Sequence, residues 1–248
     1  MDLRFQPTAK IRCEEEVMDG LPATCYKALR RLRRRCGKPA VLLSAIAVNT
    51  ADYLGLWGWR QVYEGVDPYE LPWYSPTADA DLLLTVGKFA PKPGLALDLG
   101  SGPGVNALAL ASLGWSVTGI DIAPGAIRMA KEFARDLPKV HADFVLADLV
   151  RFRPRPNSLD LIYDWGCLHN LRAETWPKWI ELVAGALKPT GLLIAKEHAY
   201  ERSVGYRPHG FTETELRTLV GAHLKIISIT KTRTRKLPAL LLIARKAS

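Results

Sequence analysis

The chain lacks the features that typify small secreted domains and membrane-spanning proteins. Its four cysteines form no C-x-x-C pair: three are spaced widely within the first 36 of 248 residues, and the fourth is Cys167. This pattern argues against a disulfide framework and indicates reduced thiols. The apolar run 39–48 is too short to cross a bilayer. It follows an arginine run, but the acidic residues 14–16 and its late position make it a poor signal peptide. We therefore expect a cytoplasmic protein.

Positive charge is in excess, and it is concentrated in two places. The net charge is +9, with 34 Lys and Arg against 25 Asp and Glu. Such clusters can meet phosphate groups or an acidic membrane surface, but a solvated basic helix face and a basic hairpin explain them equally well. The first cluster comprises Lys27, Arg30, Arg31, Arg33, Arg34, Arg35 and Lys38, and the second comprises Lys225, Lys231, Arg233, Arg235 and Lys236.

From Leu95 onward, short β-rich runs alternate with amphipathic helical segments, and no internal repeat or low-complexity tract interrupts them. This alternation predicts right-handed crossovers and a parallel sheet in an α/β protein. The predicted strands are 95–100, 116–121, 141–147, 159–165 and 191–197, and the predicted helices are 105–113, 125–135 and 175–187.

The C-terminal part has a different pattern. Thr212 and Glu215 form a capping box, which predicts a helix over 212–220. Two strands, 224–232 and 239–245, then follow, joined by a short basic loop at 233–238. This spacing predicts an antiparallel hairpin that closes the sheet.

The chain divides near residue 90. Residues 1–90 are less regular than the rest and contain short helical segments punctuated by Pro22 and Pro39. Ligands bind outside the carboxyl ends of parallel strands. We therefore predict that residues 1–90 form a helical cap over that edge and that residues 91–248 form the main domain.

The most informative stretch is a strand that runs into three glycines. The sequence LALDLGSGPG ends at Gly104, a helix follows, and the next strand ends in Asp121. This order is typical of a βαβ unit that binds a nucleoside, with the second carboxylate placed for ribose hydroxyls. The glycine spacing is G-x-G-x-G, and Asp98 would repel a pyrophosphate, so a dinucleotide fits poorly. A cationic ligand without phosphate would tolerate Asp98.

The stretches LDLGSGPG and VTGIDIAPGAI resemble the first two motifs of class I S-adenosylmethionine-dependent methyltransferases. The resemblance covers about residues 90–248. It implies a Rossmann-like, doubly wound, seven-stranded sheet that is mostly parallel with a C-terminal antiparallel hairpin, and it implies S-adenosylmethionine as cofactor, with S-adenosylhomocysteine as product.

The resemblance also implies roles for residues at three strand ends. Asp98 would anchor the ammonium of the cofactor's methionine, and Asp121 would hold both ribose hydroxyls. Asp148 would accept the adenine amino group. An N-cap or a turn is the alternative role of each carboxylate. The further residues expected at the cofactor are Gly100, Ser101, Gly102, Gly104, Ile122, Leu149, Asp164 and Trp165.

The fourth strand of the main domain runs into Gly-Cys-Leu-His-Asn, where such enzymes place the transferring methyl group and the acceptor. His169 is a candidate general base because imidazole titrates in the working range. Its alternative role is structural, at the start of the next helix. Asp164 is a candidate to orient the acceptor, whereas Cys167 is expected to be a small apolar core residue. No Asn/Asp-Pro-Pro-aromatic motif is present, which argues against methylation of exocyclic amines of DNA bases.

A second resemblance lies in the segment from Trp59 to Trp73. Its aromatics, a glycine and a Pro-Trp pair resemble the entry segment of thiopurine- and thiol-type methyltransferases and related halide and metalloid enzymes. It implies that the segment crosses the cofactor and that Trp59, Tyr63 and Trp73 form an apolar lid that, with His169, binds the acceptor. Such aromatic spacing is also common in ordinary cores. The insertion Pro-Tyr-Glu-Leu before Trp73 departs from the family pattern.

These residues predict a methyltransferase that acts on a small molecule, with a thiol or another soft nucleophile preferred as acceptor. O- or N-methylation, RNA methylation, a metalloid acceptor held by cysteines and a non-catalytic cofactor-binding protein are the alternatives. No resident metal is predicted. The acceptor, the oligomeric state and the roles of the basic cluster 27–38 and of Cys167 are left open by the sequence.

Overall fold

The structure is a computed structural model, and it describes residues 58–71, 73–90, 92–137, 139–199, 210–234 and 237–247. The predictions for the basic cluster 27–38, for the apolar run 39–48 and for Cys13, Cys25 and Cys36 lie outside these ranges. Most of the predicted cap, residues 1–57, lies outside them as well.

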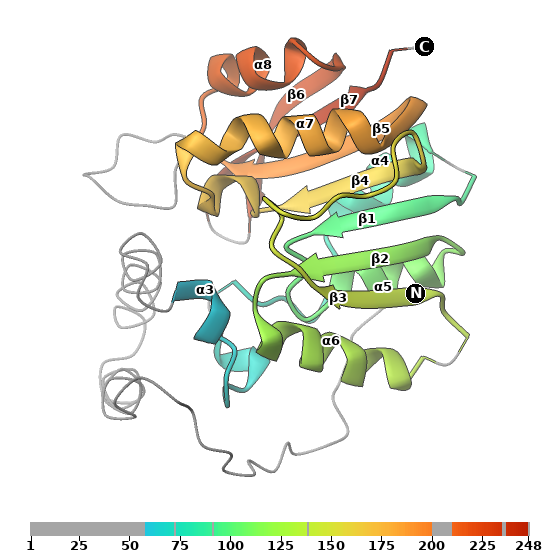
Figure 1. Ribbon diagram of the computed structural model, residues 1–248, viewed down its shortest axis with the longest axis vertical. Coiled ribbons are helices and arrows are strands. Elements are labelled where there is room, and N and C mark those ends of the chain that lie inside the picture. Colours follow the sequence, from blue (N-terminus) through green and yellow to red (C-terminus); the bar gives the residue numbers. More distant parts are fainter. Residues whose placement is uncertain are drawn as a thin grey trace.

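A seven-stranded sheet forms the centre of the described part (Figure 1), with the strand order β3-β2-β1-β4-β5-β7-β6. Strands β1 to β5 pair in parallel, and β7 pairs antiparallel with both β5 and β6. The predicted mostly parallel sheet with a closing hairpin is therefore confirmed. The strands are β1 (Leu95–Leu99), β2 (Ser116–Asp121), β3 (Ala142–Leu146), β4 (Leu159–Trp165), β5 (Leu187–His198), β6 (Lys225–Thr234) and β7 (Leu237–Arg245).

Helices cover both faces of the sheet. In Figure 1, α7 and α8 lie in front of it and α4 and α5 lie behind it, while α6 packs against β2 and β3. Short helical turns occupy the connections. The α-helices are α3 (Gly58–Gln61), α4 (Ala80–Phe89), α5 (Val105–Ser112), α6 (Pro124–Arg135), α7 (Trp176–Ala186) and α8 (Glu213–Gly221), and the 3₁₀ turns are η1 (Pro68–Glu70), η2 (Leu168–Asn170) and η3 (Ala173–Thr175).

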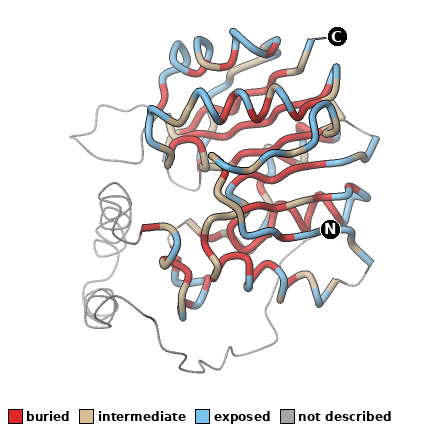
Figure 2. The backbone as a smooth tube through the Cα atoms, in the orientation of Figure 1, coloured by how far each residue is buried: buried red, intermediate tan, exposed pale blue. Residues whose placement is uncertain are grey.

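Alternate residues of the central strands face opposite sides, so the sheet separates two hydrophobic cores. Figure 2 shows the central strands buried along most of their length. One core packs Trp115 and Tyr163 against α4, α5 and α6. The other packs Trp179 of α7 and Leu216 of α8 against β4, β5 and β7. Burial on both faces explains why these strands are apolar without alternation.

Local sequence sets the ends of several helices. Thr212 and Glu215 form the predicted capping box of α8, with the Glu215 amide donating to Thr212 Oγ1 over 3.1 Å. Pro124 stands in the first turn of α6, where its missing N–H removes no hydrogen bond.

The predicted basic loop at 233–238 was wrong in length. Arg233 pairs with Pro238 and Thr234 pairs with Leu237, so one strand continues to Thr234 and the other begins at Leu237. The threonines of this segment favour extended backbone. The start of β5 also differs from the prediction, because the strand begins at Leu187 rather than at residue 191.

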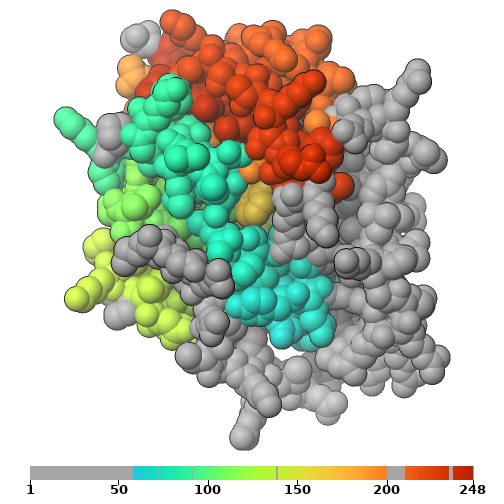
Figure 3. Space-filling view, turned by 180° about the vertical axis from the view of Figure 1, so that it is seen from behind, coloured from blue at the N-terminus to red at the C-terminus, as the bar shows by residue number. Residues whose placement is uncertain are grey.

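The helix α4 packs beside the closing hairpin on the rear face (Figure 3). Leu82 and Val86 of α4 enter the core of that face, and Thr232 of β6 donates to Asp81 over 2.6 Å. This helix therefore belongs to the layer that covers the sheet, although it precedes the predicted boundary near residue 90. That boundary stays a prediction.

A buried ion-pair cluster joins α4 to the sheet. Lys196 of β5 is buried, and its Nζ lies 2.7 Å from Asp79 Oδ1 and 2.8 Å from Asp81 Oδ2. Tyr163 donates to Asp79 Oδ2 over 2.9 Å. Burial by itself would raise the pKa of Asp81, but hydrogen bonds from Lys196 and Thr232 hold it below its usual value. The amino end of α4 is thereby fixed to β4 and β5.

Candidate active site

The predicted site residues gather at the carboxyl edge of the parallel strands. The four neighbouring strands β3, β2, β1 and β4 all end at this edge, and the segment that contains α3 lies there as well (Figure 1). Parallel α/β sheets bind ligands at this edge, because the loops after the strands meet there.

Two glycines of the loop after β1 have backbone conformations and contacts that exclude a side chain. Gly100 has φ +64°, and a Cβ there would lie 2.9 Å from Cys167 Cβ. Gly104 has φ +80°, caps α5, and a Cβ there would lie 2.6 Å from the Phe144 ring. The left-handed region is costly for other residues. The loop is therefore packed closely between β3 and the loop after β4.

Asp121, at the end of β2, orders this loop. Its Oδ2 accepts from the Gly102 amide over 2.9 Å, and its Oδ1 accepts from the Ala123 amide over 2.8 Å. Burial raises the pKa of Asp121, while these amides counteract the rise. Each carboxylate oxygen has a further lone pair, which leaves acceptor capacity for ligand hydroxyls.

Asp98 is buried at the carboxyl end of β1, and its Oδ2 has no hydrogen-bond partner among the described residues. Burial and the neighbouring carboxylates of Asp164 and Asp121 raise its pKa well above the usual value, while the Ala107 amide counteracts the rise. An unpartnered buried carboxyl beside like charges is unfavourable unless a cation compensates it. The site therefore favours a positively charged ligand.

Asp148, Leu149 and Ile122 lie beside the ends of β2 and β3. Asp148 Oδ1 accepts from the Val150 amide over 3.0 Å, so its carboxylate closes the local turn. Leu149 is buried, and Ile122 is partly exposed next to Asp121. This is the turn role that the sequence analysis gave as the alternative for Asp148. The bond uses only Oδ1, so Oδ2 is left to accept a hydrogen bond from a ligand.

Asp164 lies beneath the loop that follows β4. It is fully buried, its Oδ1 accepts from the Cys167 amide over 2.7 Å, and its Oδ2 accepts from Trp179 Nε1 over 2.8 Å. Burial and the nearby Glu197 carboxyl raise its pKa well above the usual value. Both of its oxygens are thus engaged by the protein, which gives Asp164 a supporting position under the site.

His169 is buried in η2 and is held by Glu197 of β5. Its Nδ1 lies 2.8 Å from Glu197 Oε2, and its backbone N–H donates to the same oxygen over 3.1 Å. The ring packs on Gly166, where an added Cβ would lie 2.7 Å from Cε1. A ring fixed in this way, directly after β4, is suited to proton transfer at the acceptor position.

The predicted lid residues contact one another. The rings of Trp59 and Trp73 meet edge to face with centroids 5.1 Å apart, and Trp73 Nε1 donates to the Tyr63 hydroxyl over 2.9 Å. That hydroxyl lies 3.3 Å from the position of a Cβ on Gly102. The aromatic segment therefore reaches the glycine loop. Tyr63 lies beside the loop that is expected to hold the cofactor, as well as beside the other lid residues.

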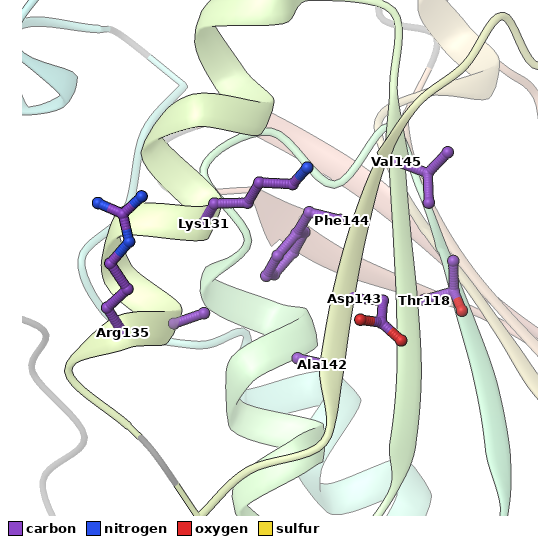
Figure 4. A pocket seen from close by; sticks show the side chains of 8 residues that line it. Thr118, Lys131, Arg135, Ala142, Asp143, Phe144 and Val145 are labelled. Carbon is purple, nitrogen blue, oxygen red and sulfur yellow. The ribbon is translucent and has the colours of Figure 1, made fainter.

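A surface hollow of about 540 Å³ lies elsewhere, between α6 and β3 (Figure 4). Lys131 of α6 extends toward Phe144 of β3 across it (Figure 4), and Arg135 and Asp143 also line it. None of the predicted site residues lines this hollow, so it is separate from the site at the carboxyl edge.

Comparison with known proteins agrees with this geometry. Residues 96–191 match a family described as a methyltransferase domain. The 2-heptyl-1-hydroxyquinolin-4(1H)-one methyltransferase of Mycobacteroides abscessus is 28% identical over 180 residues, which cover 69% of this chain and 78% of that protein. This chain belongs to the class I S-adenosylmethionine-dependent methyltransferases.

Other relatives extend the comparison. Thiocyanate methyltransferase 1 of Arabidopsis thaliana is 30% identical to this methyltransferase over 153 residues, which cover 61% of this chain and 66% of that protein. The solved structure of Burkholderia thailandensis 1,6-didemethyltoxoflavin-N1-methyltransferase with bound 1,6-didemethyltoxoflavin and S-adenosylhomocysteine matches this chain with a TM-score of 0.57 at 19% identity, and the match covers 94% of each chain. The fold of this methyltransferase is therefore that of enzymes that bind S-adenosylmethionine.

The site fits that cofactor. S-adenosylmethionine carries an ammonium and a sulfonium, and the buried, unpartnered oxygen of Asp98 would provide an anionic counterpart for such a charge. The close-packed glycine loop and Asp121 lie beside it. The structure thus brings together the predicted residues Asp98, Gly100, Ser101, Gly102, Gly104 and Asp121, and it places Ile122, Asp148, Leu149, Trp165 and His169 along the same edge.

The sequence analysis did not identify several polar residues of this edge, namely Glu197, His198 and Lys196 of β5 and Asp79 before α4. For the three residues of β5, the signal was the run Lys-Glu-His at the end of the apolar stretch GLLIA. Charged residues inside a strand that is buried on both faces need partners. Among the described residues, no cluster of three or more His, Cys, Asp or Glu side chains could hold a metal ion, and no helix is long and apolar enough to span a membrane.

Substitution of Asp121 tests the cofactor site. We expect Asp121→Ala to raise the dissociation constant for S-adenosylhomocysteine by about 10- to 100-fold, because hydrogen bonds to a charged group contribute about 1.5–3 kcal/mol. Isothermal titration calorimetry measures this change. Asp143→Ala, at an exposed position of β3, is the matched control and should bind as the unmodified protein does. Unaltered affinity in Asp121→Ala would contradict the assignment.

Proposed function

We propose that this methyltransferase acts on a small, largely apolar acceptor at an acidic thiol or hydroxyl group, and that His169 removes the proton of that group. In this proposal Asp98, Asp121, Asp148 and the glycine loop hold the cofactor. Trp59, Tyr63 and Trp73 cover the reacting atoms.

One observation carries the proposal. The imidazole of His169 is buried directly after β4, with Nδ1 within 2.8 Å of the buried Glu197 carboxyl. A histidine oriented by a carboxylate is a recurrent arrangement for general base catalysis. It would serve an acceptor that arrives with its proton, whereas a halide, which carries no proton, would gain nothing from it.

The remaining residues act by positioning and by excluding water. When bound, S-adenosylmethionine supplies a methyl group on a sulfonium, which needs no further activation. The lid aromatics bring apolar surface to the site, and removal of water strengthens the electrostatic interactions inside it. Holding the acceptor atom in line with the methyl group supplies much of the remaining rate enhancement.

The relatives support a small acceptor. One is named for a 1-hydroxyquinolinone and another for thiocyanate, so the two names specify small molecules that contain oxygen or sulfur. A thiol was the acceptor preferred from the sequence. The His169–Glu197 pair adds a reason to include hydroxyl acceptors, which are less acidic than thiols and depend more on a base.

A panel of acceptors tests the proposal. Release of S-adenosylhomocysteine is measured with aromatic thiols, phenols, N-hydroxy heteroaromatics, primary amines, iodide, thiocyanate and a structured RNA. We expect turnover with thiols or hydroxyl compounds that are mostly apolar. Turnover confined to amines, to iodide or to RNA would contradict the proposal.

A further inference from the structure

We propose that Glu197 is the positioning residue of the candidate base: it fixes the His169 ring with a proton on Nδ1, and the Asp164 carboxyl supports it by sharing a proton with it. Nε2 is then the ring nitrogen that accepts the proton of the acceptor. This inference rests on the proposed function and extends it to residues on β4 and β5.

The contacts of Glu197 define its role toward His169. Oε2 receives both the backbone N–H of His169, over 3.1 Å, and the ring nitrogen Nδ1, over 2.8 Å. Since Glu197 Oε2 binds both the backbone N–H and the ring Nδ1 of His169, it fixes the orientation of the imidazole ring relative to the backbone. The amide of His198 also lies 3.3 Å from Nδ1, but the shorter contact with a carboxylate favours Nδ1 as donor.

The other oxygen of Glu197 explains why Asp164 matters. Oε1 is buried and has no donor among the described residues, yet the side chains of Asp164 and Glu197 lie within hydrogen-bonding contact. Two carboxylates cannot bond to one another unless one carries a proton. Burial raises the pKa of both carboxyl groups, which favours retention of a proton by the pair. One proton shared between them therefore satisfies Oε1 and leaves a single negative charge next to His169.

The other titratable groups around the ring do not replace this charge. His198 of β5 stacks on His169 with ring centroids 4.0 Å apart, and burial, with His169 nearby, lowers its pKa to about 3. His198 is therefore neutral. Cys167 lies in the loop after β4, and burial together with the nearby carboxyl of Asp164 raises the pKa of its thiol well above the usual value. Asp98 and Asp121 lie beyond it, at the cofactor site.

The proton balance of the step is simple. The acceptor's proton would pass to Nε2, and the freed lone pair of the acceptor would bond to the methyl carbon as the bond from that carbon to the sulfonium sulfur breaks. S-adenosylhomocysteine would leave with that electron pair, and His169 would become an imidazolium whose charge Glu197 offsets. The imidazolium later returns the proton to solvent. The pair of carboxyls keeps its own proton throughout.

Glu197→Gln tests this inference, because it removes the charge and keeps the shape of the side chain. With a phenol or an N-hydroxy heteroaromatic as acceptor we expect kcat to fall about 10- to 100-fold. The calorimetric dissociation constant for S-adenosylhomocysteine should stay the same. With an aromatic thiol that is already ionised, kcat should change less than threefold. Glu181→Gln, at an exposed carboxylate on α7, is the control and should match the unmodified enzyme on both acceptors.

A second measurement separates positioning from a general structural effect. If Glu197 acts through His169, the double variant Glu197→Gln/His169→Gln should be no slower than His169→Gln alone. Ring ¹⁵N chemical shifts of the protein without cofactor provide a readout that needs no turnover. We expect the His169 signals of the unmodified protein to be those of the neutral form protonated on Nδ1, and those of Glu197→Ala to become an average of both neutral forms.

Three results would overturn the inference: equal loss of kcat on both acceptors, full additivity of the two substitutions, or a His169 ring protonated on Nε2 in the unmodified protein. The ¹⁵N result stands even if no acceptor of the panel is methylated. Failure of the proposed function can therefore be told apart from failure of this inference.

Discussion

Replacing His169 with glutamine should lower kcat for a hydroxyl acceptor by about 10²- to 10⁴-fold, the usual contribution of a general base. The ring is buried and held by Glu197, and glutamine keeps a similar volume without a basic nitrogen. A steady-state assay of S-adenosylhomocysteine release measures the change. The affinity for S-adenosylhomocysteine, measured by calorimetry, should be unaffected because the cofactor residues lie on β1, β2 and β3.

The same substitution should have little effect on an acceptor that enters as an anion. An aromatic thiol that is ionised at the assay pH needs no base, so its kcat should fall less than threefold. His223→Gln replaces an exposed histidine at the end of α8 and is the matched control. Equal losses on the hydroxyl and thiolate acceptors would show that His169 is structural, which was the alternative expected from the sequence.

The second large effect concerns stability. Lys196→Met should lower the free energy of unfolding by about 3–5 kcal/mol, since removal of one partner leaves Asp79 buried without a counter-charge. Lys196 and Asp79 are both nearly inaccessible, with side chains 4% and 6% exposed. Urea denaturation followed by tryptophan fluorescence measures the change.

Two further variants make that result interpretable. Lys188→Met, in the same strand, removes an ion pair with Asp160 in which the side chains are 40% and 34% exposed, and it should cost less than about 1 kcal/mol. Lys196→Met/Asp79→Asn removes the uncompensated charge as well and should recover part of the loss. A Lys196→Met protein as stable as Lys188→Met would show that the buried cluster adds no stability.

The sequence was most informative where local patterns decide the structure. The alternation of apolar runs and amphipathic segments predicted the order of strands and helices, because a strand buried on both faces must be apolar throughout. Thr212 and Glu215 predicted the start of α8, since a capping box depends only on neighbouring residues. The glycines from Gly100 to Gly104 and the carboxylates at Asp98 and Asp121 predicted the cofactor for the same reason.

The limits of the hairpin and of β5 were predicted less well. Whether 233–238 forms a loop or extends two strands depends on pairing across β6 and β7, and that pairing involves residues that are distant in sequence. The basic residues of this segment predict a loop, but an edge strand also accommodates exposed charge. The start of β5 at Leu187 likewise depends on its pairing with Leu159 of β4.

The sequence by itself determined the fold class and the cofactor and predicted the strand ends that hold it, because these follow from short patterns with a fixed geometry. Only the tertiary structure decided which polar groups meet beneath the site. Glu197 is 28 residues from His169, and Lys196 is 117 residues from Asp79. Burial forces such groups to find partners, but the sheet order decides which partners they find.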